Sequence, residues 1–168
     1  MIHKYQFKTT LEQQLNLFAR VPLIWTTIIF ASIYFLHINL TDIGFIIAGL
    51  LLFTIDTLPT IVIHTQYWKI NHNAVLNIDT ETKTITYQSP TRSVNYSFQD
   101  IDTLHYYYSY VKNTGWHSFG SYRYYKIIFR DSVELIITCF MINDIENTLE
   151  QLLGVKAGRR GQLLCLLN

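Results

Sequence analysis

The residues of this sequence that could do chemistry are few and scattered. Asp56 is a lone carboxylate within a long apolar stretch, and an ionisable group at membrane depth is by default a functional hypothesis. In an antiparallel helical hairpin Asp56 lies level with Thr26 and Thr27, whose hydroxyls could donate to it. The alternative, which we favour, is that Asp56 and nearby Pro59 mark where a helix reaches the interface, because a proton relay needs a second ionisable group at that depth.

A loop with large apolar side chains is the second candidate site. Trp116 and Phe119 lie between two glycines, which suits insertion into a partner groove or the bilayer interface. A basic rim beside them favours anionic lipid or an acidic peptide, and it comprises Lys112, Arg123 and Lys126. The competing interpretation of this region is a cross-strand aromatic ladder, with Tyr106, Tyr108 and Tyr110 on one strand face opposed by Tyr122 and Tyr124.

Patterns for catalysis and metal binding are missing from the sequence. It contains no nucleotide-binding glycine motif, no nucleophile elbow and no C-x-x-C pair. The six histidines have no ligand-type spacing: His3, His37, His64, His72, His105 and His117. Cys139 and Cys165 are too few for a disulfide framework. We therefore expect no enzymatic activity, no cofactor and no metal.

The composition indicates a chain associated with a membrane. Of 168 residues, 49% are hydrophobic and only 15% charged, against about 25% charged in soluble domains. A net charge of +1 is too small for phosphate neutralisation, so we expect no nucleic-acid partner.

Two apolar stretches, 21–40 and 43–63, are each about as long as a helix that crosses a hydrocarbon core. We predict a two-helix transmembrane hairpin over 21–64, with Trp25, Tyr67 and Trp68 as interfacial anchors. Lysines and arginines flank the pair only at its outer ends. The positive-inside rule therefore predicts a multi-pass membrane protein with both termini cytoplasmic. Residues 1–20 are expected to form a cytoplasmic N-terminal segment.

The chain after the hairpin changes to the period of β-strands. Short alternating segments with a turn about every ten residues predict six or seven antiparallel strands in a barrel or sandwich. An amphipathic helix follows, with Asn143 as the expected N-cap and Gly154 at its C-terminal end. We place this domain over 65–154. The basic and apolar tail, 155–168, is open between a membrane-surface segment and a frayed end, and Ala157–Gly161 favours fraying.

A membrane hairpin followed by meander strands and one C-terminal helix resembles the bacterial membrane-anchored PH-like proteins of the YcxB type. The resemblance rests on loose patterns over nearly the full length: 76–79 with 83–87, then 98–101, then 135–140 leading into the helix. It implies a mainly β (α+β) PH-like antiparallel barrel capped by an amphipathic helix, held at the inner membrane, with no catalytic residues. The first β-hairpin offers only Asp79, Glu81 and Lys83 where phosphoinositide-binding PH domains need several bases.

These observations favour a non-enzymatic interaction module tethered to the membrane. Its partners would be the lipid bilayer and a protein of unknown identity, and assembly into a homo-oligomer is left open. The alternative is a ligand-gated membrane effector whose barrel senses a small molecule such as a cyclic nucleotide. An interior filled by tyrosine and isoleucine would argue against that alternative.

Overall fold

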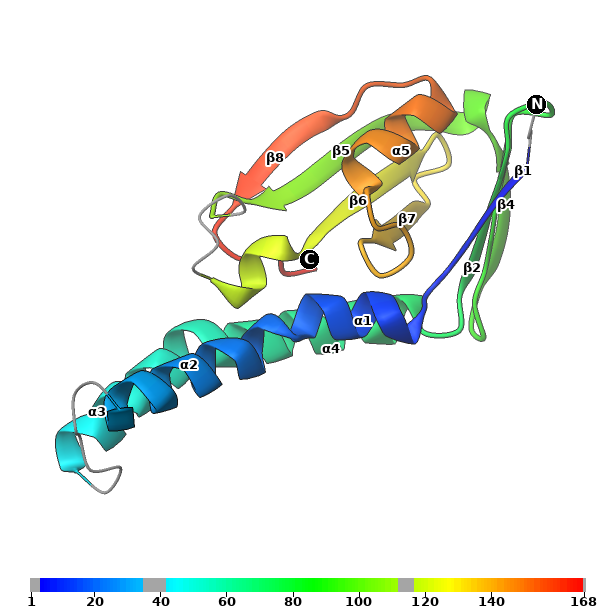
Figure 1. Ribbon diagram of the computed structural model, residues 1–168. Helices are drawn as coiled ribbons and strands as arrows, with labels where there is room; N and C mark the ends of the chain where they lie inside the picture. The colour runs from blue at the N-terminus through cyan, green and yellow to red at the C-terminus, as the bar shows by residue number, and fades with distance from the viewer. Residues whose placement is uncertain (1–3, 35–41, 112–116, 168) are drawn as a thin grey trace.

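The protein consists of two β-sheets, a C-terminal helix that covers the second sheet, and a long helical hairpin that projects from one end (Figure 1). The computed structural model describes residues 4–34, 42–111 and 117–167, with the side chain of Arg20 left out.

The first sheet is a fully antiparallel meander in the order β1-β2-β3-β4. Its strands are β1 (Lys4–Lys8), β2 (Val75–Asp79), β3 (Thr84–Gln88) and β4 (Ser93–Ser97). Alternation sends one set of side chains into the core, where Leu76, Ile78, Ile85 and Tyr87 are buried. The opposite face carries amide and hydroxyl side chains and stays in solvent.

Strand β1 shows that the N-terminal segment is part of the folded domain. Lys4 pairs with Asp79 and Lys8 with Val75, so the first strand of the sheet is separated from the second by the entire hairpin. The prediction that residues 1–20 form a segment outside the domain is therefore wrong. Lys4–Lys8 alternates polar and apolar residues, but five residues are too few to predict a strand without knowledge of the pairing with β2.

The second sheet has the order β7-β6-β5-β8. Its strands are β5 (Ile101–Ser109), β6 (Arg123–Phe129), β7 (Glu134–Thr138) and β8 (Gly158–Gln162). A 3-10 turn, η2 (Phe98–Asp100), joins β4 to β5. The two sheets do not join along their edges into one closed barrel, so the predicted barrel is replaced by an α+β arrangement of two four-stranded sheets.

The tail is held in the fold by the pairing of β8 with β5 and by tyrosine hydroxyls that donate hydrogen bonds to its backbone carbonyls. β8 runs parallel to β5, so the prediction that the glycine-containing segment frays is wrong. Beyond β8, Tyr67 donates to the carbonyl of Cys165 (3.0 Å) and Tyr124 to that of Leu166 (3.3 Å). The cost of glycine in a strand is offset here by the ladder hydrogen bonds and these tyrosine contacts.

Helix α5 (Ile145–Leu153) covers the second sheet through Ile145, Leu149 and Leu153, which are buried. The N-cap is Asp144, one residue later than expected, and its side chain makes no capping bond. Gly154 ends the helix at φ 66°, a conformation that L side chains rarely adopt. This C-terminal prediction is confirmed.

The helical hairpin extends at both outer ends beyond the two apolar stretches, 21–40 and 43–63, from which it was predicted. Its first arm is α1 (Leu11–Phe18) followed by α2 (Arg20–Tyr34), and its second arm is α3 (Ile43–Leu52), a π-helical turn η1 (Phe53–Thr57) and α4 (Leu58–Asn71). The two arms, Leu11–Tyr34 and Ile43–Asn71, are each long enough and apolar enough to cross a membrane.

Side-chain caps fix the ends of these helices. Thr10 forms a capping box with Gln13, which satisfies two otherwise unpaired N–H groups. Asp42 accepts from the N–H of Gly44 at 2.8 Å, so this acidic residue begins α3. The arms are joined by Trp25, whose indole N–H donates to Thr57 Oγ1 at 2.8 Å.

Helix α4 is at once the last part of the hairpin and the core helix of the domain. Thr60, Ile63, Tyr67 and Asn71 recur every three or four residues and are buried against the sheets. Tyr67, expected at the membrane interface, is fully buried. The hydrophobic core continues through aromatic and aliphatic residues of the second sheet and its connections, among them Tyr106, Tyr122, Tyr125, Ile127 and Phe140.

Candidate functional site

Asp56 lies at the junction between the hairpin and the domain. It belongs to η1 and is 3% exposed. Its Oδ1 accepts the backbone N–H of Ser118 at 2.9 Å and lies 3.4 Å from His117 Nδ1. Single π-turns within α-helices occur frequently at functional sites, and this one directs the carboxylate toward η3 (Ser118–Ser121).

The partners predicted for Asp56 are wrong. Thr26 and Thr27 donate instead to backbone carbonyls of their own helix, Thr27 to Leu23 at 2.8 Å. The prediction took partners from the neighbouring arm, whereas the true partner is 62 residues away in the β5–β6 connection. No sequence pattern connects the two positions.

Replacing Asp56 with alanine is expected to lower the thermal midpoint of the purified protein in mild detergent by about 3 to 8 °C. The buried N–H of Ser118 would lose its acceptor, which costs about 1 to 3 kcal/mol. Asp56→Asn keeps an acceptor oxygen and should lose less than half as much. Equal losses in the two variants would show that the hydrogen bond to Ser118 is not what holds the junction.

The aromatic loop contributes less to the surface than the sequence indicated. Phe119, predicted to contact a partner, is 4% exposed and lies in the core, stacked on the ring of His117. Trp116 and Lys112 lie outside the described residues. A short 3-10 turn buries Ser118, Phe119 and Gly120 together. This part of the loop therefore packs into the domain and is not exposed to a partner.

The predicted basic rim is neutralised by acidic neighbours. Arg123 Nη1 lies 3.5 Å from Glu146 Oε2, and Lys126 Nζ lies 2.8 Å from Glu134 Oε2. Both bases come from β6. Their charges are therefore paired within the domain, and a strongly anionic ligand would have to compete with these carboxylates.

Glu146 organises a polar cluster between α5 and the second sheet. Its Oε1 lies 3.1 Å from Arg159 of β8, and Tyr106 donates to Oε2 at 3.1 Å. The guanidinium of Arg159 also lies 4.8 Å from the ring centroid of Tyr106. Burial raises the pKa of the Tyr106 hydroxyl, so it remains a donor. No sequence pattern indicates this cluster, because its members lie on three separate elements, α5, β5 and β8.

The tyrosine ladder is present, in a register different from the predicted one. Tyr106 faces Tyr125 with ring centroids 4.9 Å apart, and Tyr107 stacks on Tyr124 at 4.5 Å. The ladder therefore uses both faces of the β5–β6 pair. Tyr122, expected in the ladder, packs in the core beside Tyr67.

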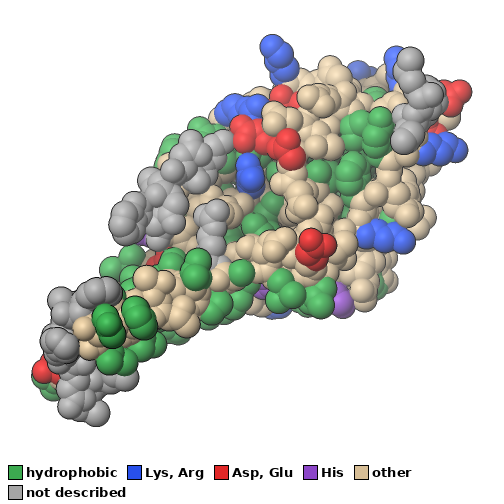
Figure 2. Space-filling model, in the orientation of Figure 1, with side chains coloured by type: hydrophobic (Ala, Val, Ile, Leu, Met, Phe, Trp, Pro, Cys, Tyr) green, Lys and Arg blue, Asp and Glu red, His purple; other side chains and the backbone are tan. Residues whose placement is uncertain are grey.

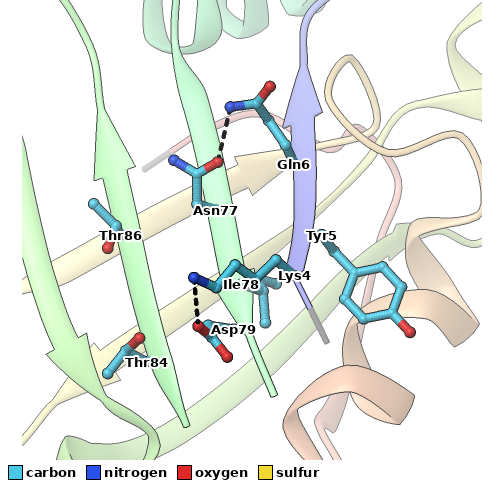
Figure 3. Close-up of a pocket in the computed structure, with 8 residues that line it drawn as sticks. All are labelled: Lys4, Tyr5, Gln6, Asn77, Ile78, Asp79, Thr84 and Thr86. Carbon is cyan, nitrogen blue, oxygen red and sulfur yellow. Dashed lines mark hydrogen bonds and ion pairs between the residues drawn. The ribbon is translucent and has the colours of Figure 1, made fainter. Parts of the chain in front are cut away.

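An open depression of about 450 Å³ lies over the first sheet. Figure 3 shows Lys4 reaching Asp79 (3.7 Å) and Gln6 donating to Asn77 (3.0 Å) across it. Asp79 also accepts from the N–H groups of the β2–β3 turn, which hold the pKa of its carboxyl below the usual range. The lining is rich in amides and hydroxyls, with its lysine paired: Lys4, Tyr5, Gln6, Asn77, Ile78, Asp79, Thr84 and Thr86. Such a surface suits hydrogen bonding with a neutral polar ligand or peptide rather than a polyphosphate.

Among the described residues, no group of three or more His, Cys, Asp or Glu side chains is placed to hold a metal ion. His64 Nδ1 lies 2.9 Å from the Tyr122 hydroxyl.

Burial raises the pKa of the Cys139 thiol to about 11 and of the Cys165 thiol to about 12, so both stay protonated at neutral pH and are poor nucleophiles.

Comparison with known proteins places the fold in a family. The family model described as PH domain matches residues 2–151, a range that contains the first sheet, the whole hairpin and strands β5 to β7 and ends within α5. The chain therefore belongs to the PH domain family. No curated protein and no solved structure matches it. PH domains are in general non-catalytic modules that bind lipids or proteins.

Proposed function

We propose that this chain is a non-catalytic interaction module tethered to a membrane, which presents its PH domain at the cytoplasmic face of the inner membrane. The observation that carries the proposal is the apolar surface of the hairpin. Only 12% and 22% of its two most apolar windows is buried, whereas the core helix of a soluble protein would be mostly covered. Figure 2 shows hydrophobic side chains over the projecting helices and charged ones mainly over the globular part.

The exposed apolar side chains are concentrated in one region. All but three of the large hydrophobic residues exposed in the described part of the chain lie between Leu11 and Val62. Soluble monomers rarely expose contiguous apolar patches larger than a few hundred Å². A bilayer would remove these side chains from water at about 25 cal/mol per Å².

The way the hairpin is built into the fold supports the proposed topology. β1 and α1 precede the first arm, and β2 follows the second, so both arms leave from the same domain. If the connection at Asp42 crosses the bilayer, the domain and both chain ends lie on one side of it. The basic residues at the outer ends of the pair favour the cytoplasmic side.

The described residues give no support to a ligand-gated effector. The space between the sheets is filled by tyrosines and aliphatic side chains, and the depressions identified are open to solvent. A protein or lipid partner bound at the surface fits this interior better.

The proposal is tested by fractionating cells that express the full chain, with topology reporters placed after Asp42 or after Asn168. We expect the chain to resist alkaline carbonate extraction, with the C-terminal reporter active on the cytoplasmic side and the reporter after Asp42 active on the other. Release by carbonate would overturn the membrane tether. A cytoplasmic reporter after Asp42 would overturn the crossing.

A further inference from the structure

The hairpin that projects clear of the domain is short for a membrane span. From Ile43 to Ile55 no residue of the second arm is buried, and at Asp56 the domain begins to cover it. Those 13 residues, counted from 43 to 55, rise about 20 Å. A hydrocarbon core is about 30 Å thick, so the free part of the hairpin falls short by about 10 Å.

The missing length is present on one side of α4. Thr60, Ile63 and Tyr67 face the sheets, whereas Leu58, Ile61 and Val62 point away from them and are 44%, 38% and 41% exposed. We call these three residues the underside stripe. From Ile43 to Val62 the exposed apolar side is 20 residues long, or about 30 Å.

The chemistry of the stripe changes where a bilayer would end. On the same side of α4, the next exposed residues are Thr65 and Lys69. A progression from aliphatic side chains to a hydroxyl and then a lysine matches the passage from hydrocarbon to headgroups.

From these observations we infer that the PH domain lies directly against the bilayer, with the underside stripe in contact with lipid. This inference rests on the proposed membrane tether and adds an orientation to it. One side of α4 between Leu58 and Val62 faces lipid while the opposite side faces the sheets. The carboxylate of Asp56 avoids hydrocarbon at this level because Ser118 and His117 cover it.

The test uses single cysteines in the full chain, reconstituted in vesicles of phosphatidylethanolamine and phosphatidylglycerol. Leu58→Cys and Ile61→Cys report on the stripe, Ile47→Cys on the projecting part, and Thr84→Cys on the outer face of the first sheet. The native Cys139 and Cys165 are 3% and 0% exposed, so their failure to react with a water-soluble maleimide shows that each variant is folded.

We expect Ile47→Cys, Leu58→Cys and Ile61→Cys each to label about tenfold or more slowly than Thr84→Cys. If Ile47→Cys is slow while Leu58→Cys or Ile61→Cys labels as fast as Thr84→Cys, the domain is held away from the bilayer and the inference is overturned, but the tether stands. If Ile47→Cys also labels fast, the tether itself is absent.

Discussion

Substitution of Asn71 by alanine is expected to lower the free energy of unfolding by about 2 to 3 kcal/mol, which corresponds to about 5 to 10 °C in thermal midpoint for a chain of this size. Asn71 is fully buried at the end of α4. Its Oδ1 accepts from both the N–H and the hydroxyl of Thr138 in β7. Its Nδ2 lies 3.5 Å from the Tyr87 hydroxyl of β3.

The size of this effect follows from burial. Alanine would leave the Thr138 donors without an acceptor in the core, and an unsatisfied buried group costs its full desolvation energy. The one amide also touches both sheets, so its loss loosens the contact of α4 with each.

Asn95→Ala is the matched control. Asn95 is an exposed asparagine of β4 that accepts from Thr86 at 3.0 Å, and its loss should cost no more than about 0.5 kcal/mol. Both variants are measured by thermal unfolding of the full chain in the same detergent. Equal shifts in thermal midpoint would show that the buried hydrogen bonds of Asn71 stabilise the fold no more than the exposed one of Asn95.

The double substitution Ile47→Arg and Leu50→Arg is expected to abolish integral membrane association. Both side chains lie on α3 and are 54% and 61% exposed. Arginine at the centre of a membrane helix costs about 2.5 to 3.5 kcal/mol per residue. The protein should move from the carbonate-resistant pellet to the supernatant.

The control for this pair is Ile47→Leu with Leu50→Ile, which keeps the apolar character and should stay in the pellet. The globular domain should remain folded in both variants, since neither side chain is buried in it. Retention of the double-arginine variant in the pellet would contradict a hairpin whose α3 faces lipid.

The features that the sequence predicted are those encoded in local patterns. Two apolar runs indicated the two arms, alternation indicated most strands, and Gly154 marked the end of α5. Each of these signals comes from a few neighbouring residues and needs no knowledge of distant partners.

What the sequence did not predict depends on pairing over long separations. β1 is only five residues long and β8 contains two glycines, and both strands exist because β2 and β5 provide ladder partners. The same holds for the candidate site. Asp56 was found as an isolated carboxylate, but its contact with Ser118 follows from the tertiary fold, and so does the burial of Phe119.

The insertion of the hairpin between β1 and β2 has a consequence for the order of events during synthesis. β1 leaves the ribosome first, yet its partner β2 begins at Val75, after both arms of the hairpin. Closing so long a connection is entropically costly until the two arms have paired. The first sheet therefore completes only after the two arms have come together, so formation of the hairpin precedes completion of the fold.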